Sequence, residues 1–535
     1  MRFRIPANFQ GYNAALVGFD NFKEAPPAIL ADTLEYIGAK RLRLPGGDIA
    51  NFMNWDEGRI IGDAKADEHG DGRRYGKYSD FDRTPEPLPF HLRWQTHKEF
   101  KLEDVASVVK NGRFELTWCV NILTGGGGGE TALAKEVRHI KEAEALGMSV
   151  DNIELGNELY FTIPNYRWSI ADGEGAIENS AGYARRAARW AQRMRQEFPD
   201  AKIYAIGSDG HHYQDQDWNE QLVNHGVFDY VDGVTIHPYH SINEASNAQL
   251  SDVGNAQRAE EIAIASLNQL KDTLNNPKLD LIPDDKRILI TEHAVIEDSN
   301  NPKTGRVVWG NTWASSLCLT LHNLTFLVDG RIEGADLHVL TGNPQWEAIA
   351  NERGEGIDPA KRGKENAPYS EGVYEPLEPT MHGFTLGLSA DILNGGEGTL
   401  LASEPGYMAI MVERDGSTFL LAVNTTNKER SLTVPDGFNG VVSFYVAGPW
   451  YDKPTLLDED EILYFKAGEE IDIPAWSKVI GEGAAVENDP PVDVTPPTVE
   501  PAPNTPSDMS EKLRELNRRL TALEDVVKAV KDAIS

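Results

Sequence analysis

The sequence predicts an α/β protein with a (β/α)8 barrel, followed by an antiparallel β-sandwich. Eight short apolar segments alternate with amphipathic, helix-like segments over residues 1–394. Several of these segments are continuous apolar runs, as in parallel strands that helices cover on both faces. From residue 395 the pattern changes to short strands with turn residues between them. A chain of 535 residues is also too long for a single core.

The barrel elements follow one another in regular order. The expected strands cover residues 14–20, 41–47, 114–123, 152–158, 202–209, 232–239, 287–293 and 336–342. The expected helices cover residues 131–147, 181–198, 258–274, 312–330 and 379–396. Eight such repeats favour a closed barrel over an open sheet. A dinucleotide-binding fold is disfavoured because no Gly-x-Gly-x-x-Gly motif follows the first strand.

Three further segments follow the barrel. Residues 395–485 contain the short strands of the expected sandwich. Residues 486–508 carry seven prolines, which predicts an extended linker. In residues 509–535, apolar residues alternate at intervals of three and four, which predicts a coiled-coil helix. We therefore expect a homo-oligomer, either a dimer or a trimer, although a helix docked on its own globule would have the same pattern.

Composition excludes several classes of function. The formal net charge of −33 should repel nucleic acid and anionic membranes. No apolar run approaches the roughly 18 residues that span a bilayer, and the first residues lack the apolar core of a signal peptide. We therefore expect a protein that is cytoplasmic as synthesised. Cys119 and Cys318 lie in apolar runs and are expected to be buried thiols, and we expect neither a metal nor a cofactor.

Two glutamates stand at the ends of expected barrel strands. Glu158 ends the fourth strand in the sequence IELGNE, and Glu292 ends the seventh. Reactive groups of a (β/α)8 barrel lie at the carboxyl ends of its strands, so both side chains should project into one mouth. A pair of carboxylates is what hydrolysis of a glycosidic bond requires, with one as proton donor and the other as nucleophile. The pair therefore predicts a glycosidase.

The Gly-Asn-Glu at the end of strand four and the Glu at the end of strand seven resemble the signature of clan A retaining glycoside hydrolases. The resemblance implies a (β/α)8 barrel in which Glu158 is the acid/base and Glu292 the nucleophile. It implies that Asn157 holds the 2-hydroxyl of the sugar. It also implies that Arg43, His237 and Tyr239 support the nucleophile.

Within that clan, the stretch LRLPGGDIANFMNWDEG is most similar to the α-L-arabinofuranosidases and related xylosidase-like families. Their Arg-x-Pro-Gly-Gly motif is also followed by a Trp, here Trp55. The chain departs from their pattern at Asp48, where they have Asn, and at His293, where Trp is usual. These departures concern the substrate and not the reaction.

Four residues outside the signature are candidate substrate contacts. Trp55 and Trp346 could offer an aromatic face to a sugar ring. His211 and His212 follow the fifth strand and are expected to be rim or substrate contacts, with a plain surface loop as the alternative. They lack a third ligand at suitable spacing, so we do not expect a metal there.

The sequence thus predicts a retaining glycoside hydrolase that cleaves an O-glycosidic bond in a plant, algal or bacterial poly- or oligosaccharide by double displacement. The alternative is a non-catalytic carbohydrate-binding barrel. Either could be mounted on a bacteriophage virion or released on lysis, because the proline linker and terminal helix suit such a particle. The sugar, the linkage, and exo or endo action stay open.

Overall fold

The computed structural model describes most of the barrel and of the segment that follows it. The described residues are 1–14, 27–56, 58–60, 101–109, 114–122, 131–160, 177, 179–210, 217–241, 256–296, 309–342, 346–350, 374–449, 455–457 and 463–484. The expected linker at 486–508 and the expected coiled-coil helix at 509–535 lie outside them. None of the described helices is both long enough and apolar enough to cross a membrane.

Eight parallel strands form a closed barrel, as predicted. They are β2 (Gln10–Asn13), β3 (Arg41–Leu44), β6 (Glu115–Cys119), β7 (Val150–Glu154), β8 (Lys202–Ile206), β9 (Gly233–Ile236), β11 (Arg287–Ile296) and β12 (Ile332–Leu337). Each strand pairs with the next in this order, and β12 pairs with β2 to close the ring. A short strand, β10 (Tyr239–Ser241), extends the ladder of β11 at its carboxyl end.

The first barrel strand lies earlier in the chain than the sequence predicted. We expected it at residues 14–20, but the strand is β2, which ends at Asn13. Its sequence, QGYN, lacks the apolar run that marks the other strands, because Gln10 and Asn13 are buried polar residues that donate to Ile37 and Glu292. Each of the other seven strands overlaps its predicted range.

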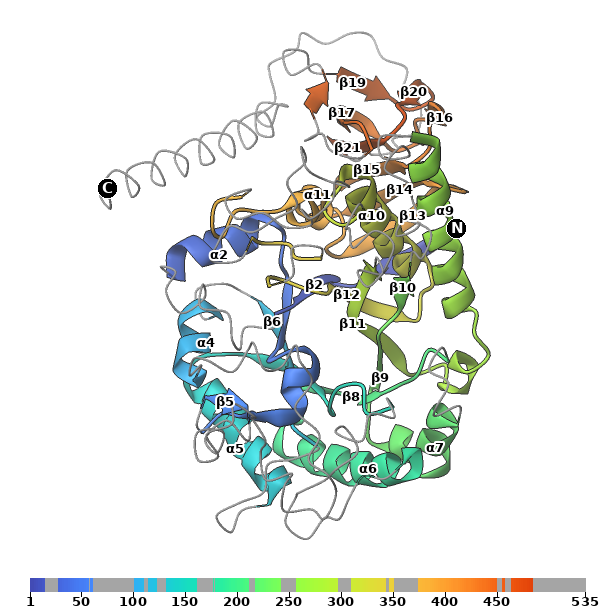
Figure 1. Cartoon of the computed structure of the whole chain (residues 1–535). Coiled ribbons are helices and arrows are strands. Elements are labelled where there is room, and N and C mark those ends of the chain that lie inside the picture. The colour runs from blue at the N-terminus through green and yellow to red at the C-terminus, as the bar shows by residue number, and fades with distance from the viewer. Residues whose placement is uncertain are drawn as a thin grey trace, which may run out of the picture.

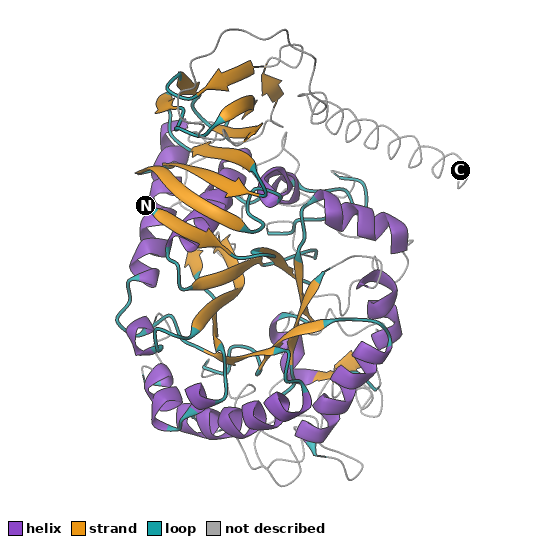
Figure 2. Ribbon diagram, turned by 180° about the vertical axis from the view of Figure 1, so that it is seen from behind, coloured by secondary structure: helices purple, strands orange, loops and turns teal. Residues whose placement is uncertain are grey.

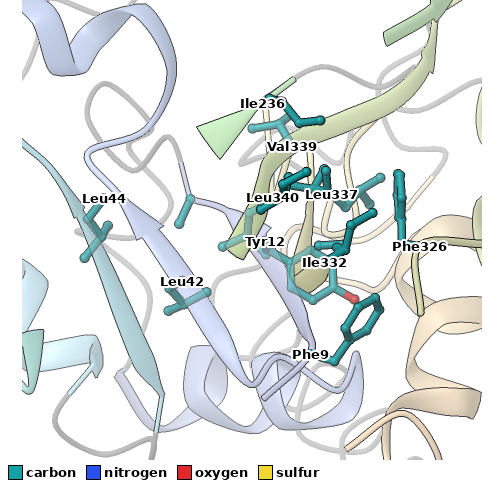
Figure 3. Packing of buried hydrophobic residues seen from close by; sticks show 14 of the residues in the cluster. Phe9, Tyr12, Leu42, Leu44, Ile236, Phe326, Ile332, Leu337, Val339 and Leu340 are labelled. Atoms are coloured by element: carbon teal, nitrogen blue, oxygen red, sulfur yellow. The ribbon is translucent and has the colours of Figure 1, made fainter. Parts of the chain in front are cut away.

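The barrel core is built from the apolar runs that predicted the strands. Strands β3 and β9 are buried at every position, as expected for parallel strands that are covered on both faces. Figure 3 shows Tyr12, Leu42 and Leu337 from neighbouring strands among the buried side chains, with Phe326 from a surrounding helix beside them. The strand ends are therefore held by a dense apolar layer.

Helices surround the strands as a ring (Figure 2). They are α2 (Pro27–Tyr36), α4 (Leu102–Val109), α5 (Ala132–Ala145), α6 (Ser180–Glu197), α7 (Trp218–Asn224), α9 (Ala256–Leu274), α10 (Trp313–Val328) and α11 (Met381–Ala390). Short 3-10 helices are η1 (Gly47–Phe52), η5 (Val227–Asp229) and η7 (Leu279–Leu281). The side chains of Thr131, Asn179 and Thr312 accept backbone N–H groups at the starts of α5, α6 and α10.

An antiparallel sheet follows the barrel. Its strands are β13 (Gly396–Glu404), β14 (Tyr407–Arg414), β15 (Ser417–Asn424), β17 (Asn439–Val446), β18 (Thr455–Leu457), β19 (Leu463–Lys466) and β21 (Ser477–Ala484), with β1 (Arg2–Ile5) at one edge. A two-stranded sheet, β16 (Arg430–Thr433) and β20 (Glu470–Ile473), shares a second apolar core with it. A small hairpin, β4 (Met53–Asn54) and β5 (Arg59–Ile60), stands apart.

Strands β1, β13 and β18 of this sheet were not predicted. Residues 396–404 form β13, whereas the expected last helix was placed up to residue 396 and α11 ends at Ala390. The first residues of the chain form β1, which pairs antiparallel with β13. The N-terminal strand thus belongs to the C-terminal sheet (Figure 1).

The sheet packs directly on the barrel helices. Helix α10 contacts β1, β14 and β15. The indole N–H of Trp313 on α10 donates to the backbone oxygen of Trp476 at 2.7 Å. Lys478 on β21 is fully buried, and its ammonium nitrogen donates to the backbone oxygen of Thr385 and to Ser389 on α11. Apolar packing and buried hydrogen bonds therefore join the two parts.

Three histidines pack against one another in the core behind the barrel wall. His240 on β10, His293 on β11 and His322 on α10 have ring centroids 5.3 Å and 6.5 Å apart, measured from His322 to the other two. Burial, together with the neighbouring histidines, lowers the pKa of His293 to about 3 and lowers that of His322 well below its ordinary value. Both rings are therefore neutral in the folded protein.

These histidines predict a loss of stability on mild acidification. Below about pH 6.5 the unfolded chain binds protons that the folded state excludes, so the free energy of unfolding decreases as the pH is lowered. Replacing His322 with Phe should make the loss between pH 6.5 and 5.5 smaller by about 1 kcal/mol. Urea unfolding at both pH values measures the difference. The same replacement at His225, at the end of α7, should leave the loss unchanged, and equal losses in wild type and His322→Phe would contradict the prediction.

Candidate active site

The carboxyl ends of the barrel strands bring a cluster of polar side chains together. Seven strands contribute to this cluster of buried or half-buried residues. Its members are Asn13 on β2, Arg43 on β3, Glu154 on β7 with Asn157 and Glu158 just beyond, His237 after β9, Tyr239 on β10, Thr291 and Glu292 on β11, and His338 after β12.

The turn after β7 places Glu158 by an unusual backbone path. Gly156 has a φ of 95°, and a Cβ there would lie 2.5 Å from Cγ2 of Ile122, so only glycine fits. Glu158 itself has a φ of 46°, in the left-handed region that residues other than Gly, Asn and Asp rarely adopt. Such strain is typical of functional positions, where the surrounding structure holds the residue in place.

A second glycine lies beside Glu292. Gly47 follows β3 with a φ of 56°, and a Cβ on it would lie 3.6 Å from Oε1 of Glu292, which is an ordinary van der Waals contact. The Pro-Gly-Gly sequence thus brings the backbone at the start of η1 beside this carboxylate. The positive φ, and not lack of space, favours glycine at this place in the motif.

Glu292 is surrounded by hydrogen-bond donors. Its Oε1 accepts from Nη1 of Arg43 at 2.5 Å and from Nδ2 of Asn13 at 2.9 Å. Its Oε2 accepts from the hydroxyl of Tyr239 and lies 3.4 Å from Nδ1 of His338. Burial disfavours the charge, but His237, His338, Arg43 and the Tyr239 hydroxyl outweigh it and lower the pKa of Glu292. The carboxylate is therefore ionised and oriented at neutral pH.

Arg43 links three residues of the cluster. Its guanidinium is fully buried and donates to Oε2 of Glu154 at 2.5 Å, to Glu292, and to Oδ1 of Asn157 at 2.7 Å. Burial opposes the positive charge, but Glu154 and Glu292 outweigh it and hold the pKa of Arg43 above its ordinary value. The planar guanidinium presents its N–H donors to these acceptors in a rigid fork, whereas a lysine ammonium is a compact point charge without fixed donor directions.

Glu158 lies opposite Glu292 and close to it. Its Oε1 is 2.8 Å from Nδ1 of His237 and 3.3 Å from the hydroxyl of Tyr160, which donates to it. Nδ1 of His237 is 3.8 Å from Oε2 of Glu292. One carboxylate oxygen of Glu158 and one of Glu292 lie within 4.8 Å of each other. A single sugar linkage can therefore contact both carboxylates.

His237 stands between three carboxylates. Burial alone would lower the pKa of His237, but Glu292, Glu154 and Glu158 outweigh it and raise this pKa to about 10. The ring therefore carries or shares a proton at neutral pH. Arg43 and His237 together balance most of the negative charge of the three glutamates.

Most predicted site residues meet in this cluster. Asn157, Glu158, Glu292, His237, Tyr239 and Arg43 all lie within it. Trp346 is half-buried and packs against His338, with ring centroids 5.6 Å apart, so it stands at the wall of the site. His211 and His212 lie outside the described residues.

Trp55 is buried, with 4% of its surface exposed, and its ring packs in the hydrophobic core against Trp118, with centroids 5.0 Å apart. Its role as a sugar platform stays a prediction. Asp56, the next residue, binds Lys135, Arg138 and His139 on α5, which anchors this stretch to the barrel wall.

The sequence analysis did not identify Glu154, Thr291, Asn13 or His338. Glu154 lies in an apolar run four residues before Glu158 and is fully buried, so a carboxylate at that place was a signal for an internal partner. Thr291 directly precedes Glu292. Asn13 was missed because β2 was placed too late in the chain, and His338 lies within an expected strand.

Two groups of side chains within the described residues have ligand atoms close enough to share a cation. One consists of Asp56, His139 and Glu142, but Lys135 and Arg138 already pair with Asp56. The other consists of Glu158, His237 and Glu292, where the positive charge of Arg43 is already in contact with Glu292. We therefore interpret the second group as proton-transfer groups.

Comparisons with solved structures find proteins with a similar fold. AbfB, a family 51 α-L-arabinofuranosidase from Bifidobacterium longum, superposes with a TM-score of 0.56 at 14% identity, over 90% of this chain and 96% of that one. An α-L-arabinofuranosidase from Thermotoga maritima, solved with arabinose, gives 0.55 at 15% identity, over 90% and 97%. The family 30 xylanase Xyn30A from Clostridium acetobutylicum gives 0.50 at 12% identity, over 90% and 97%.

No protein-family model matches the sequence, and no curated protein matches it. The likeness to solved structures establishes the fold, which is that of clan A glycoside hydrolases such as the arabinofuranosidases and xylanases. The resemblance stated from the motifs is thus confirmed for the fold.

Arg43 should be essential for the stability of the barrel. Replacing it with Met removes the guanidinium that pairs with both Glu154 and Glu292, and leaves two buried carboxylates without that partner. The free energy of unfolding should fall by about 3–5 kcal/mol, as measured in urea. Lys40→Met, which breaks the exposed pair with Asp391, should change it by less than about 0.5 kcal/mol. Equal effects of the two replacements would argue against this role.

Proposed function

We propose that the protein is a retaining glycoside hydrolase. The observation that carries the proposal is the pair Glu158 and Glu292, whose nearest carboxylate oxygens lie within 4.8 Å in a buried cluster at the strand ends. Retaining enzymes hold their two carboxyl groups about 5–5.5 Å apart, whereas inverting enzymes separate them by about 6.5–9.5 Å. The short separation supports double displacement.

In the first step Glu292 is the nucleophile. Its ionised carboxylate attacks the anomeric carbon and forms a glycosyl ester, while the bond from that carbon to the leaving oxygen breaks. Glu158 gives its proton to this oxygen, so the leaving alcohol departs neutral. The donors on Oε1 of Glu292, Arg43 and Asn13, hold the carboxylate in place during the attack.

In the second step Glu158, now ionised, takes a proton from water. The resulting hydroxide oxygen bonds to the anomeric carbon, and the ester bond to Glu292 breaks. The sugar leaves with its original anomeric configuration, Glu292 is again a carboxylate, and Glu158 is again protonated. Tyr239 and Arg43 stabilise the carboxylate as it is released.

We propose a carbohydrate substrate from a plant, algal or bacterial oligo- or polysaccharide. The likeness to arabinofuranosidases, both in motifs and in fold, favours a pentose in the site. Asn157 stands beside Arg43 at the position that holds the sugar 2-hydroxyl in the clan signature. His338 and Trp346 form a wall opposite the turn after β7 and are candidates for contacts to the sugar ring.

A barrel that only binds carbohydrate is not favoured. A binding site needs no ionised carboxylate that is held by three donors, nor a second carboxylate within 4.8 Å of it. Burying these charges costs folding free energy. Catalysis gives a reason for both.

Replacement of each glutamate tests the proposal. Glu292→Ala should abolish hydrolysis, because no nucleophile remains. Glu158→Ala should slow natural substrates by about 10²–10⁴, but should slow aryl glycosides with activated leaving groups much less in the first step. A screen of pentosides, galactosides and acidic polysaccharides, with product anomers followed by NMR, supplies the substrate and the stereochemistry.

Glu144→Ala serves as a control, because this partly exposed residue lies on α5, away from the strand ends. It should leave turnover unchanged. Inversion of configuration, or near-normal hydrolysis by both Glu158→Ala and Glu292→Ala, would overturn the proposal.

We also propose that residues 509–535 assemble the chain into a dimer or trimer, and that the enzyme acts in the cytoplasm or on a virion from which lysis frees it. The heptad pattern of these residues supports the first part. The proline-rich segment that precedes them would keep the assembly clear of the catalytic mouth.

Removal of residues 509–535 should convert the oligomer into a monomer without loss of turnover. Light scattering on the full chain and on the truncated chain measures the change in mass. The double replacement Leu516→Asp and Leu523→Asp places charges among the apolar residues of the heptad pattern without shortening the chain. It should have the same effect. A full chain that is monomeric at micromolar concentration would exclude the oligomer.

A further inference from the structure

A chain of hydrogen bonds runs from Arg43 to Glu158 through residues with no role in the steps above. Nε of Arg43 donates to Oε2 of Glu154. Oε1 of Glu154 accepts from the hydroxyl of Thr291 at 2.9 Å. The same hydroxyl oxygen lies 2.9 Å from Nε2 of His237, whose Nδ1 lies 2.8 Å from Oε1 of Glu158.

The direction of each hydrogen bond follows from the chemistry of its partners. Glu154 is fully buried, and although burial opposes its charge, Arg43 and His237 lower the pKa of Glu154 to about 2. A carboxylate only accepts, so the single hydrogen of the Thr291 hydroxyl points to Glu154. The hydroxyl oxygen must then accept from His237, which therefore carries a hydrogen on Nε2.

This leaves Nδ1 of His237 as the ring atom that responds to Glu158. When Glu158 is protonated, Nδ1 accepts its hydrogen, and when Glu158 is ionised, Nδ1 donates to it. In both cases one proton is shared by the pair. Titration of two groups in such contact belongs to the pair and not to either residue.

We propose that Glu154 and Thr291 are positioning residues that fix the hydrogen of His237 on Nε2, so that Glu158 and His237 hold the catalytic proton as a unit. The inference rests on the proposed function and deepens it, because it names the residues that keep the acid in its proton-donating form. Without this relay His237 could place its hydrogen on Nδ1, where it would stabilise an ionised Glu158 that cannot act as an acid.

Other charged and titratable groups also lie around Glu158 and His237 and affect the proton that they share. Glu292 lies 3.8 Å from Nδ1 of His237, and Glu154 lies 3.9 Å from its Nε2. Tyr160 donates to Glu158, and Tyr239 donates to Glu292. Arg43 pairs with Glu154 and Glu292. None of these contacts reaches Nε2 of His237 at hydrogen-bond distance, so within the described residues Thr291 alone selects this hydrogen.

Thr291→Val removes the hydroxyl at nearly constant volume. The N–H on Nε2 then has no acceptor, which disfavours every protonated form of the Glu158–His237 pair, because each form carries that hydrogen. The alkaline limb of the pH profile of kcat/KM should move to lower pH by about one unit. Aryl glycosides whose leaving groups need no proton from Glu158 should be affected least. Thr291→Ser, which keeps a hydroxyl at this position, should have the alkaline limb of the wild type.

Thr235→Val is the matched control. Thr235 lies on β9, the barrel strand that pairs with β11, and is equally buried, yet its hydroxyl has no hydrogen-bond partner in the described part of the chain. The same replacement there should leave the pH profile unchanged. A wild-type alkaline limb in Thr291→Val, or an equal shift in Thr235→Val, would overturn the relay.

Glu154→Gln is a second variant that should shift the alkaline limb, but for a different reason. With its amide oxygen toward Arg43, its NH2 group faces Thr291, so the threonine hydroxyl turns and donates to Nε2 of His237. The hydrogen then resides on Nδ1 and favours an ionised Glu158. The alkaline limb should again shift down, whereas Glu154→Asp, which can only accept, should keep it. The opposite ranking of these two variants would contradict the proposal.

A measurement without substrate separates this inference from the proposed function. Because the pKa of His237 is raised, its contribution to stability is complete below about pH 6.5 and is lost as pH rises toward about 10. In Thr291→Val the loss should occur at lower pH than in Thr235→Val, as measured by urea unfolding between pH 6 and 10. If Glu292→Ala retains hydrolysis but this difference is present, the proposed function fails and the relay stands. If the difference is missing, the relay fails.

Discussion

The buried guanidinium of Arg43 is the interaction on which the rest of the site depends. Three acidic side chains lie in one buried cluster at the strand ends, and ionised carboxylates that share a site repel each other strongly. Arg43 touches two acids, Glu154 and Glu292, and reaches the amide of Asn157 beside the third. Its planar shape fixes the angles between these groups as well as their charge.

The site also separates the roles of its carboxylates by what surrounds them. Glu292 meets donors on both oxygens and stays ionised, as a nucleophile requires. Glu154 is ionised and has no access to solvent, so it can only orient its partners. Glu158 sits at the turn, beside a histidine that can take or return a proton. Three chemically equal groups thus differ because each has a different set of neighbours.

The sequence predicted the barrel and much of the site because both depend on local signals. Apolar runs identified seven strands, and the ends of two of these strands identified Glu158 and Glu292. Arg43, Asn157, His237 and Tyr239 followed from motifs that lie next to strand ends. These are features that a reader of the chain can place without knowing which strands are neighbours.

What the sequence could not supply depends on contacts between distant segments. Asn13 reaches Glu292 across 279 positions of the chain, from a strand without an apolar run. Thr291 matters only because Glu154, 137 positions away, lies beside it. Trp55 was expected at the site because of its type and position, and no local pattern predicts its packing against Trp118 on β6. The strand β1 is nearly 400 positions from its partner β13, so no local pattern announces their pairing.

That pairing of β1 with β13 has a consequence for how the chain is made. Residues 2–5 are synthesised before the barrel strands, but the edge they join does not exist until Gly396–Glu404 has been synthesised. The whole barrel is therefore laid down, and is free to close, before the first strand finds its place. The pairing of β1 with β13 holds the start and the end of the barrel segment side by side. This pairing can form only after all the barrel strands have been synthesised.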